Sequence, residues 1–458
     1  MNKSTIFISS FNPFISRNIL CTDALGLFRS REDVLIVIFV PDYKSAYFAK
    51  QFGGPNIVVE GVNLPSASPA DIFFTYLASS LVWTGTLWAH KKEKFFRDKK
   101  LLRFLVSGLL MKLAGRLGFV KDLVRWLDLR TISGHVFRDY FEKYKPDLVF
   151  ATDVFNNDDA KLIAGAKFFG AVSVAMVRSW DNITSKGMFR VKPDKLIVHN
   201  ELIKHEAVKY EGMNPGDIFV SGLPQFDRYI KSPRLAREQF FRRIKLDPQG
   251  KLVLFSPFGQ RFSSTDWQVL DILKQGRLRG EIPKEVQFLV RLPPNDSVAF
   301  LDRFAADEAF FLDRPGHQFS AGVFRDTELD EKDTEWLADS LYHCDLVISG
   351  GATLLVDGAV FDKPAILIYL DGWEHRPYSK SVRRFMEYDH GLWLRNSRAI
   401  KTVFTPGELF GAINEYLVHP ENDSVKRLSM AKEQCWRLDG QSGRRIYNFI
   451  SSLLSPGV

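Results

Sequence analysis

Cysteine is scarce in this 458-residue sequence, which holds only Cys21, Cys344 and Cys435. Three widely separated cysteines form neither a disulfide framework nor the paired spacing of a zinc site. Their scarcity fits a reducing compartment, and we expect a cytoplasmic protein. No window has the ~18 consecutive apolar residues of a membrane-spanning helix. The apolar run at the start, MNKSTIFISS, is too short for the core of a signal peptide.

Most of the chain has balanced charge, and one segment holds all of the excess positive charge. The net charge is +8, and residues 91–130 alone hold twelve Lys or Arg and four Asp or Glu, giving 12 − 4 = +8. Leucines are interleaved with these cations, which fits a basic amphipathic helix on an anionic membrane surface. A helix with a solvated basic face and a buried apolar face fits equally well. Nucleic acid is not expected as a partner, because no aromatic–glycine, helix-turn-helix or zinc pattern accompanies the charge.

Apolar content of 45% over this length is enough for two domains. Short apolar runs alternate with helical patterns, which predicts α/β domains with doubly wound parallel sheets. Residues 70–145 are mainly helical, an insertion in the first domain. We place the domain boundary near residue 230, giving domains 1–230 and 231–458. The expected strands are 5–10, 33–41, 56–62, 147–152, 171–177, 194–199 and 217–221, then 251–256, 285–291, 346–348 and 365–370.

The stretch 345–370, DLVISGGATLLVDGAVFDKPAILIYL, reads as strand, glycine turn, helix and strand. Adjacent glycines let the backbone approach a ligand closely. A helix that starts near Ala352 would direct free N–H groups at the turn, which favours a phosphate. An ordinary βα turn is the alternative. The candidates for phosphate contact are Ser349, Gly350, Gly351, Ala352 and Thr353.

This arrangement resembles the nucleotide-sugar site of GT-B glycosyltransferases. The similar families are the lipid-II-forming N-acetylglucosaminyltransferases, the non-hydrolysing UDP-N-acetylglucosamine 2-epimerases and the CDP-glycerol glycerophosphotransferases. Asp357 falls where that pattern has a Glu that holds the ribose hydroxyls. The Gly-x-Pro-x-x-Asp string at 222–227 resembles the element where GT-B chains cross to the second domain. The resemblance implies two Rossmann-like domains that face a cleft, with the last helix returning to the first domain.

A polar loop follows the strand expected at 171–177. It contains Trp180, Asp181, Asn182 and Lys186, at the strand end where open α/β sheets bind ligands. The string SWDNITSKG resembles a loop of bacterial surface-carbohydrate transferases of GT-B type, which makes Asp181 the candidate general base. A plain helix cap and turn is the alternative. The next candidates are Asp153, Asp158 and Asp159.

Three further loops at predicted strand ends carry candidate donor contacts. Gly259 and Arg261 follow one strand, Arg291 ends another, and Arg376 lies in the polar loop 371–380. Guanidinium groups bind pyrophosphate well. Each arginine could equally form a surface ion pair.

The resemblance implies transfer of a sugar from a nucleotide-activated donor to a hydroxyl of a surface glycan or lipid-linked acceptor. The sequence has no Asp-x-Asp motif, which favours a site without metal, and no cofactor beyond the donor is expected. The alternatives are glycerophosphate transfer from CDP-glycerol, a nucleotide-sugar 2-epimerase, or a non-catalytic glycan-binding or scaffold protein. The His-Arg-x-Glu-Asn and His-Gly-Asp-Thr strings of the epimerases are absent.

Overall fold

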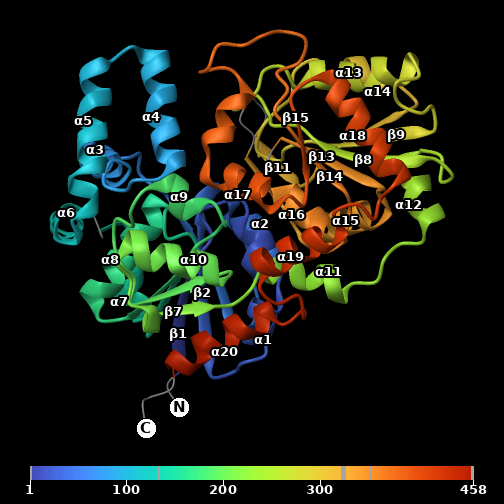
Figure 1. The fold of residues 1–458 in the computed structure, drawn as a ribbon. Coiled ribbons are helices and arrows are strands. Elements are labelled where there is room, and N and C mark those ends of the chain that lie inside the picture. The colour runs from blue at the N-terminus through green and yellow to red at the C-terminus, as the bar shows by residue number, and fades with distance from the viewer. Residues whose placement is uncertain (1–2, 133–134, 321–325, 351–352, 455–458) are drawn as a thin grey trace. The chain divides into compact units, whose positions relative to one another are not determined.

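The computed structural model describes residues 3–132, 135–320, 326–350 and 353–454. Its chain divides into two compact units (Figure 1). The first comprises Met1–Lys91, Lys100–Ile230 and Cys435–Val458, and the second comprises Lys92–Lys99 and Lys231–Gln434.

The first unit is built on a seven-stranded parallel sheet in the order β3-β2-β1-β4-β5-β6-β7. Each expected strand is present, with ends shifted by at most one residue. The strands are β1 (Ser4–Ser9), β2 (Val34–Pro41), β3 (Ile57–Val62), β4 (Leu148–Ala151), β5 (Val172–Met176), β6 (Lys195–Val198) and β7 (Ile218–Val220).

Alternating side chains of the central strands fill both faces of this sheet. Ile6 and Ile8 of β1 pack into one apolar cluster, and Phe7 between them packs into the other. This period of two is what a strand with helices on both sides requires. The helices of this unit are η1 (Ser16–Leu20), α1 (Asp23–Arg29), η2 (Asp42–Lys44), α2 (Ser45–Phe52), α8 (Asn157–Phe169), α9 (Asn182–Lys186), α10 (Glu201–Glu206), η4 (Ala207–Glu211), η5 (Pro215–Asp217), η6 (Pro224–Phe226), α11 (Asp227–Lys231) and α20 (Ser442–Leu454).

Residues 69–144 are helical, as the sequence pattern predicts. They form α3 (Pro69–Ala78), α4 (Gly85–Asp98), α5 (Leu101–Lys112), η3 (Ala114–Arg116), α6 (Gly118–Thr131) and α7 (His135–Tyr144). Several of these helices share a small core of their own, which includes Leu81, Val82, Leu87 and Met111.

The last helix of the chain, α20, packs against α1 in the first unit. The ring centroids of Phe28 and Tyr447 are 4.7 Å apart. Asp227, at the end of the Gly-x-Pro-x-x-Asp string, accepts hydrogen bonds from the backbone N–H groups of Ser442 (3.0 Å) and Gly443 (2.8 Å). A carboxylate at a helix N-terminus is favourable because free N–H groups and the helix dipole meet there.

The second unit has a six-stranded parallel sheet in the order β10-β9-β8-β13-β14-β15. Its strands are β8 (Lys251–Ser256), β9 (Val286–Arg291), β10 (Phe310–Asp313), β13 (Leu346–Ser349), β14 (Ala365–Ile368) and β15 (Lys401–Val403), and a separate hairpin pairs β11 (His317–Ser320) with β12 (Asp326–Glu328). Its helices are α12 (Arg237–Ile244), α13 (Asp266–Leu278), α14 (Asp302–Ala305), α15 (Glu331–His343), α16 (Thr353–Val360), η7 (Val382–Glu387), α17 (Asp389–Ser397), α18 (Pro406–Val418) and α19 (Ser424–Cys435).

Both sheets are doubly wound, and their strand order reverses beside the first strand of each unit. The switch lies between β1 and β4 in the first sheet and between β8 and β13 in the second. Ligands of open α/β sheets bind outside the carboxyl ends of the strands at such a point. Each unit is thus a Rossmann-like domain, as predicted for the GT-B fold class. Residues 69–144 form the predicted helical insertion, of which Lys92–Lys99 belong to the second unit.

Candidate functional site

The switch point of the second unit lies at the predicted glycine turn. β13 ends at Ser349, whose Oγ donates a hydrogen bond to the carbonyl of Ser256 at the end of β8 (3.3 Å). α16 begins at Thr353, and Thr353 is exposed. Gly351 and Ala352 lie outside the described residues. Ser349 and Gly350 therefore lie beside the end of β8, at the position where the sheet topology favours a ligand.

Gly350 is buried against an aromatic ring. A Cβ built on Gly350 would lie 1.9 Å from the ring of Phe258, in the loop after β8. Phe258 itself stacks on Phe385, with ring centroids 5.3 Å apart. We expected this glycine to admit a ligand, and the structure gives it a second role, because only a residue without a side chain leaves room for the ring.

Two aspartates shape the loop that follows β8. Gly259 has a φ of +89° and donates its N–H to Asp266 (2.7 Å). The backbone N–H of Arg261 binds Asp296 (2.9 Å), and the side chain of Arg261 is exposed. Burial raises the pKa of Asp266 to about 7. The loop thus presents Arg261 from a backbone held by buried carboxylates.

The other predicted donor residues differ in exposure and partners. Arg291 is buried and forms an ion pair with Asp313. Asp357 is buried on α16. Arg376 Nε lies 3.5 Å from Glu374 Oε2, an ion pair without a hydrogen bond, and this buried nitrogen has no hydrogen-bond acceptor within the described part of the chain. Of the three, Arg376 retains a donor that an added oxygen could satisfy.

In the first unit, the loop at 178–187 contains the predicted base. Asp181 precedes α9, and its side chain does not cap that helix. Instead its carboxylate accepts hydrogen bonds from Ser179 Oγ (2.5 Å), Asn182 Nδ2 (3.4 Å) and Ser185 Oγ (3.4 Å). The helix-cap alternative therefore does not explain this side chain.

Helices of the insertion hold this loop in place. Thr84 Oγ1 donates to the carbonyl of Thr184 (2.6 Å), and the N–H of Met188 donates to the carbonyl of Ala78 (3.1 Å). Trp180 packs against the apolar cluster under β5 and β6. The insertion is thus part of the scaffold that positions Asp181.

Asn182 and Lys186 differ in their surroundings. Asn182 is buried, and its Oδ1 has no hydrogen-bond donor among the residues that the structure describes. Lys186 is exposed at the end of α9. An acceptor substrate could therefore meet a carboxylate, an amide and a cation from one short segment.

A row of side chains at the carboxyl ends of β4, β5 and β6 was not predicted as a unit. Arg178 Nε donates to Asp153 Oδ2 (2.7 Å). His199 follows β6, and the parallel register of β5 and β6 places it opposite Arg178. Burial and the charge of Arg178 lower the pKa of His199 to about 4, so its ring is neutral at pH 7. Neither ring nitrogen has a hydrogen-bond partner in the described ranges.

A buried carboxyl group lies at the switch point itself. Asp159, in the first turn of α8, accepts a hydrogen bond from Ser9 at the end of β1. Burial and the nearby charge of Asp153 raise the pKa of Asp159 well above its usual value. The neighbouring Asp153, by contrast, accepts a hydrogen bond from the Arg178 guanidinium (2.7 Å). The sequence signal for this pair was the string TDVFNNDD at 152–159, which holds three aspartates between the end of a strand and the first turn of the next helix.

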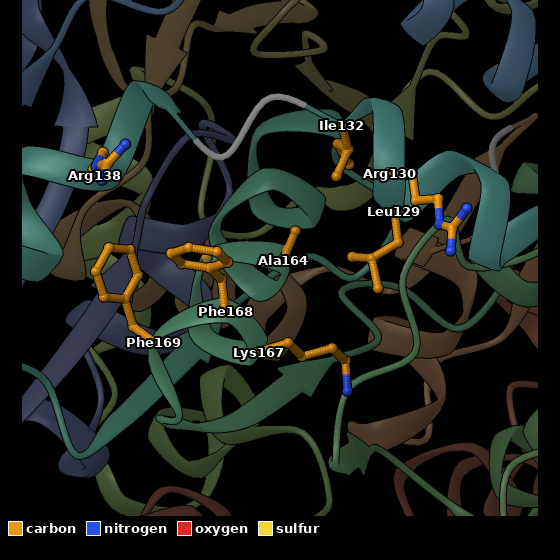
Figure 2. A pocket seen from close by; sticks show the side chains of 9 residues that line it. Leu129, Arg130, Ile132, Arg138, Ala164, Lys167, Phe168 and Phe169 are labelled. Atoms are coloured by element: carbon orange, nitrogen blue, oxygen red, sulfur yellow. The ribbon is translucent and has the colours of Figure 1, made fainter.

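The first unit also contains two cavities away from the strand ends. One, of about 410 Å³, lies among α6, α7 and α8. Figure 2 shows the rings of Phe168 and Phe169 within it, with Arg130 and Arg138 at opposite ends of the view. The other, of about 440 Å³, is lined mainly by η3, α6 and η4 and by basic side chains.

Two findings bear on metals and membranes. Among the described residues, no group of three or more His, Cys, Asp or Glu side chains could hold a metal ion. Within the same ranges, no helix combines the length and apolar character needed to cross a bilayer.

Solved structures share this fold across nearly the whole chain. A UDP-GlcNAc 2-epimerase from Neisseria meningitidis bound to UDP-GlcNAc matches with a TM-score of 0.58 and 10% identity, covering 98% of this chain and 100% of that one. The glycotransferase of kitacinnamycin matches with a TM-score of 0.53, 12% identity and coverage of 99% and 100%. A glycosyltransferase from Rickettsia africae matches with a TM-score of 0.50, 10% identity and full coverage of both chains. No family model and no curated protein matches the sequence.

Proposed function

We propose that this protein is a glycosyltransferase that moves a sugar from a nucleotide-activated donor to a hydroxyl of a surface glycan or lipid-linked acceptor, without a metal ion. The observation that carries the proposal is the Ser349–Gly350 turn at the β8/β13 switch point, followed by the N-terminus of α16. Support for the donor class comes from fold neighbours whose structures contain UDP-GlcNAc or UDP.

The second unit is assigned to the donor. N–H groups at the start of α16 would meet the phosphates, and Arg261 and Arg376 would add guanidinium groups. These fixed dipoles and charges would stabilise the negative charge that grows on the leaving diphosphate. Asp357 is assigned to the ribose hydroxyls, and Arg291, already paired with Asp313, would support the loop rather than contact the phosphates.

The first unit is assigned to the acceptor. Asp181 would remove the proton from the attacking hydroxyl, Asn182 and Trp180 would orient the acceptor, and Lys186 would balance charge. The carboxylate of Asp181 already receives hydrogen bonds from two hydroxyl groups, which shows that hydroxyl donors fit around it.

The test replaces Asp181 by Asn, which keeps the size of the side chain and removes its basicity. A positioned base contributes ~10²- to 10⁴-fold, so sugar transfer from a panel of nucleotide sugars should fall by that factor while donor affinity stays within about twofold. Asp33→Asn, an exposed carboxylate of the same unit, is the matched control. Transfer above about a tenth of wild type in Asp181→Asn would move the base to Asp153.

An epimerase is the second candidate, because UDP-GlcNAc 2-epimerases are among the fold neighbours. An epimerase acts on the nucleotide sugar alone, whereas a transferase releases nucleotide at full rate only with an acceptor. Measuring UDP release and sugar configuration with and without acceptor therefore separates the two reactions.

We further assign the basic segment 91–130 to peripheral contact with an anionic membrane surface. Its helices α5 and α6 expose large apolar side chains, which argues against the alternative in which the leucines enter the core. Attraction to anionic lipid should weaken with salt, because the Debye length falls from ~10 Å at 0.1 M to ~3 Å at 1 M.

A further inference from the structure

The basic cavity of about 440 Å³ lies beside the exposed helices of the insertion. η3 and the start of α6 form one side of it, and η4 and the segment around Lys192 form another. Five cations and two carboxylates line it, giving 5 − 2 = +3. These charged residues are Arg116, Lys121, Arg125, Lys192, Lys209, Asp122 and Glu211.

The two carboxylates are already occupied. Arg125 binds Glu211 (2.7 Å) and Asp122 (3.1 Å), and Lys192 also binds Asp122 (3.1 Å). Lys121 is buried and donates its Nζ hydrogen to the carbonyl of Tyr210 (2.7 Å). These contacts form the floor of the cavity and hold its shape.

Arg116 and Lys209 complete the lining from the exposed side. In the part of the chain that the structure describes, neither lies within ion-pair distance of a carboxylate. Both side chains are exposed. The cavity therefore offers two cations without a carboxylate partner among the described residues, beside a floor that carries a net charge of +1. Lys209 lies over the ring of Tyr210 (4.8 Å). This arrangement suits an anion with several oxygens.

Exposed apolar side chains alternate in sequence with residues that line the cavity. Gly115, Arg116 and Gly118 line the cavity, and the residues between and after them, Leu117 and Phe119, are 45% and 69% exposed. Large exposed apolar surfaces mark binding sites rather than ordinary protein surface. Further exposed apolar side chains lie on α5, just after it and on α6: Leu101, Leu102, Leu105, Val106, Leu109, Leu113, Leu123, Trp126, Leu127 and Leu129.

We propose that this cavity binds the terminal phosphate group of a membrane lipid, with Arg116 and Lys209 contacting the phosphate oxygens and Leu117 and Phe119 entering the acyl region. An amphiphilic ligand explains both the cationic lining and the exposed apolar side chains, because a soluble phosphate would contact only the cations. A helix surface that combines cations with leucine and aromatic side chains is typical of insertion at the bilayer interface.

This inference rests on the proposed membrane contact of segment 91–130 and names the lipid group recognised there. It is independent of the transfer reaction, since none of its residues belongs to the donor turn or the Asp181 loop. A loss of transfer in Asp181→Asn and a loss of lipid recognition in a cavity variant are therefore separate outcomes.

The experiment compares binding of the full chain to two kinds of phosphatidylcholine vesicle. One kind contains phosphatidic acid, which has an exposed phosphate, and the other contains phosphatidylserine at matched surface charge. We expect the wild type to prefer phosphatidic acid by about tenfold or more, the effect of one or two charge-assisted hydrogen bonds. The double variant Arg116→Gln/Lys209→Gln should lose this preference.

The matched control removes two cations of the same basic segment outside the cavity, Lys99→Gln/Lys100→Gln. It should bind both vesicles more weakly and keep the preference, because only general attraction is reduced. Leu117→Asn/Phe119→Asn should weaken binding to both vesicles, whereas Leu278→Asn, an equally exposed leucine of the second unit, should not.

Four results would overturn the proposal. Equal binding of wild type to both vesicles, or to neither, would exclude a lipid phosphate. A preference retained in the cavity double variant would place recognition elsewhere. Inorganic pyrophosphate binding as tightly as phosphatidic acid vesicles, with no effect of Leu117→Asn/Phe119→Asn, would identify a soluble phosphate as the ligand, and binding to a protein partner with no vesicle binding would identify a protein surface.

Discussion

Replacing Gly350 by Ala tests whether this glycine serves packing, ligand approach or both. The added Cβ would lie 1.9 and 2.0 Å from two ring atoms of Phe258. Ordinary contact begins at 3.4 Å, so the ring must retreat by 3.4 − 1.9 = 1.5 Å. The ring of Phe385 stacks on the ring of Phe258, which limits how far the Phe258 ring can move.

Overpacking a well-filled site costs about 1–3 kcal/mol. Gly350→Ala should therefore lower the free energy of unfolding of the second unit by that amount. Urea unfolding gives the energy, and hydrogen exchange of the β8 and β13 amides assigns it to this unit. A variant as stable as wild type, with unchanged exchange in β8 and β13, would refute the packing role.

A second substitution separates packing from ligand approach. Phe258→Ala alone loses a buried ring, and Phe→Ala changes in cores cost about 3–5 kcal/mol. In Phe258→Ala the space over Gly350 is open, so adding Gly350→Ala should not lower the free energy of unfolding further. The double-mutant cycle should therefore show a coupling energy of about 1–3 kcal/mol between the two positions. If Gly350 also admits the donor phosphates, the double variant should still bind nucleotide more weakly than Phe258→Ala in calorimetry.

Three other predictions concern single side chains. Asp357→Ala should weaken nucleotide binding in calorimetry and leave the fold intact; unaltered affinity would remove Asp357 from the site. Arg190→Met should lower the free energy of unfolding by about 3–5 kcal/mol, because Arg190 is buried between Asp71 (2.8 Å) and Asp128 (2.7 Å), whereas the half-exposed pair Arg138–Glu142 predicts a loss of at most about 1 kcal/mol for Arg138→Met. Burial raises the pKa of Asp266 from 3.8 to about 7, so its stabilising contribution is full below pH 3.8 and is lost as the pH rises through 7. Between pH 3.8 and about 7, the free energy of unfolding from urea titrations should therefore fall less steeply in Asp266→Asn than in wild type. An equal slope in the two proteins would contradict the raised pKa of Asp266.

Local sequence patterns located the strands with good accuracy. Runs such as DVLIVIFVP and DLVFAT are buried on both sides in a parallel sheet, so they must be continuously apolar wherever they lie. The loops that follow them, including residues 178–187 and 349–353, could be recognised as candidate sites. Open α/β sheets bind their ligands at the carboxyl ends of their strands, where these loops begin. The charge excess and interleaved leucines of residues 91–130 likewise predict contact with an anionic membrane surface, which stays a prediction.

Side-chain partners could not be read from local patterns. Arg291 looked equivalent to Arg261, yet only the approach of β10 to β9 brings Asp313 to its guanidinium. The row Asp153, Arg178 and His199 comes from three strands that are separated in sequence and adjacent in the sheet.

The sequence by itself determined the two α/β units, the positions of the strands and the loops at their carboxyl ends, because each depends on hydrophobic period and turn residues within a few positions. Tertiary structure alone decided that Gly350 makes room for Phe258, that the apolar side chains of α5 and α6 remain exposed, and that Arg116 and Lys209 border one cavity. Each of these depends on which distant segments pack together, and periodicity within one segment carries no information on its neighbours.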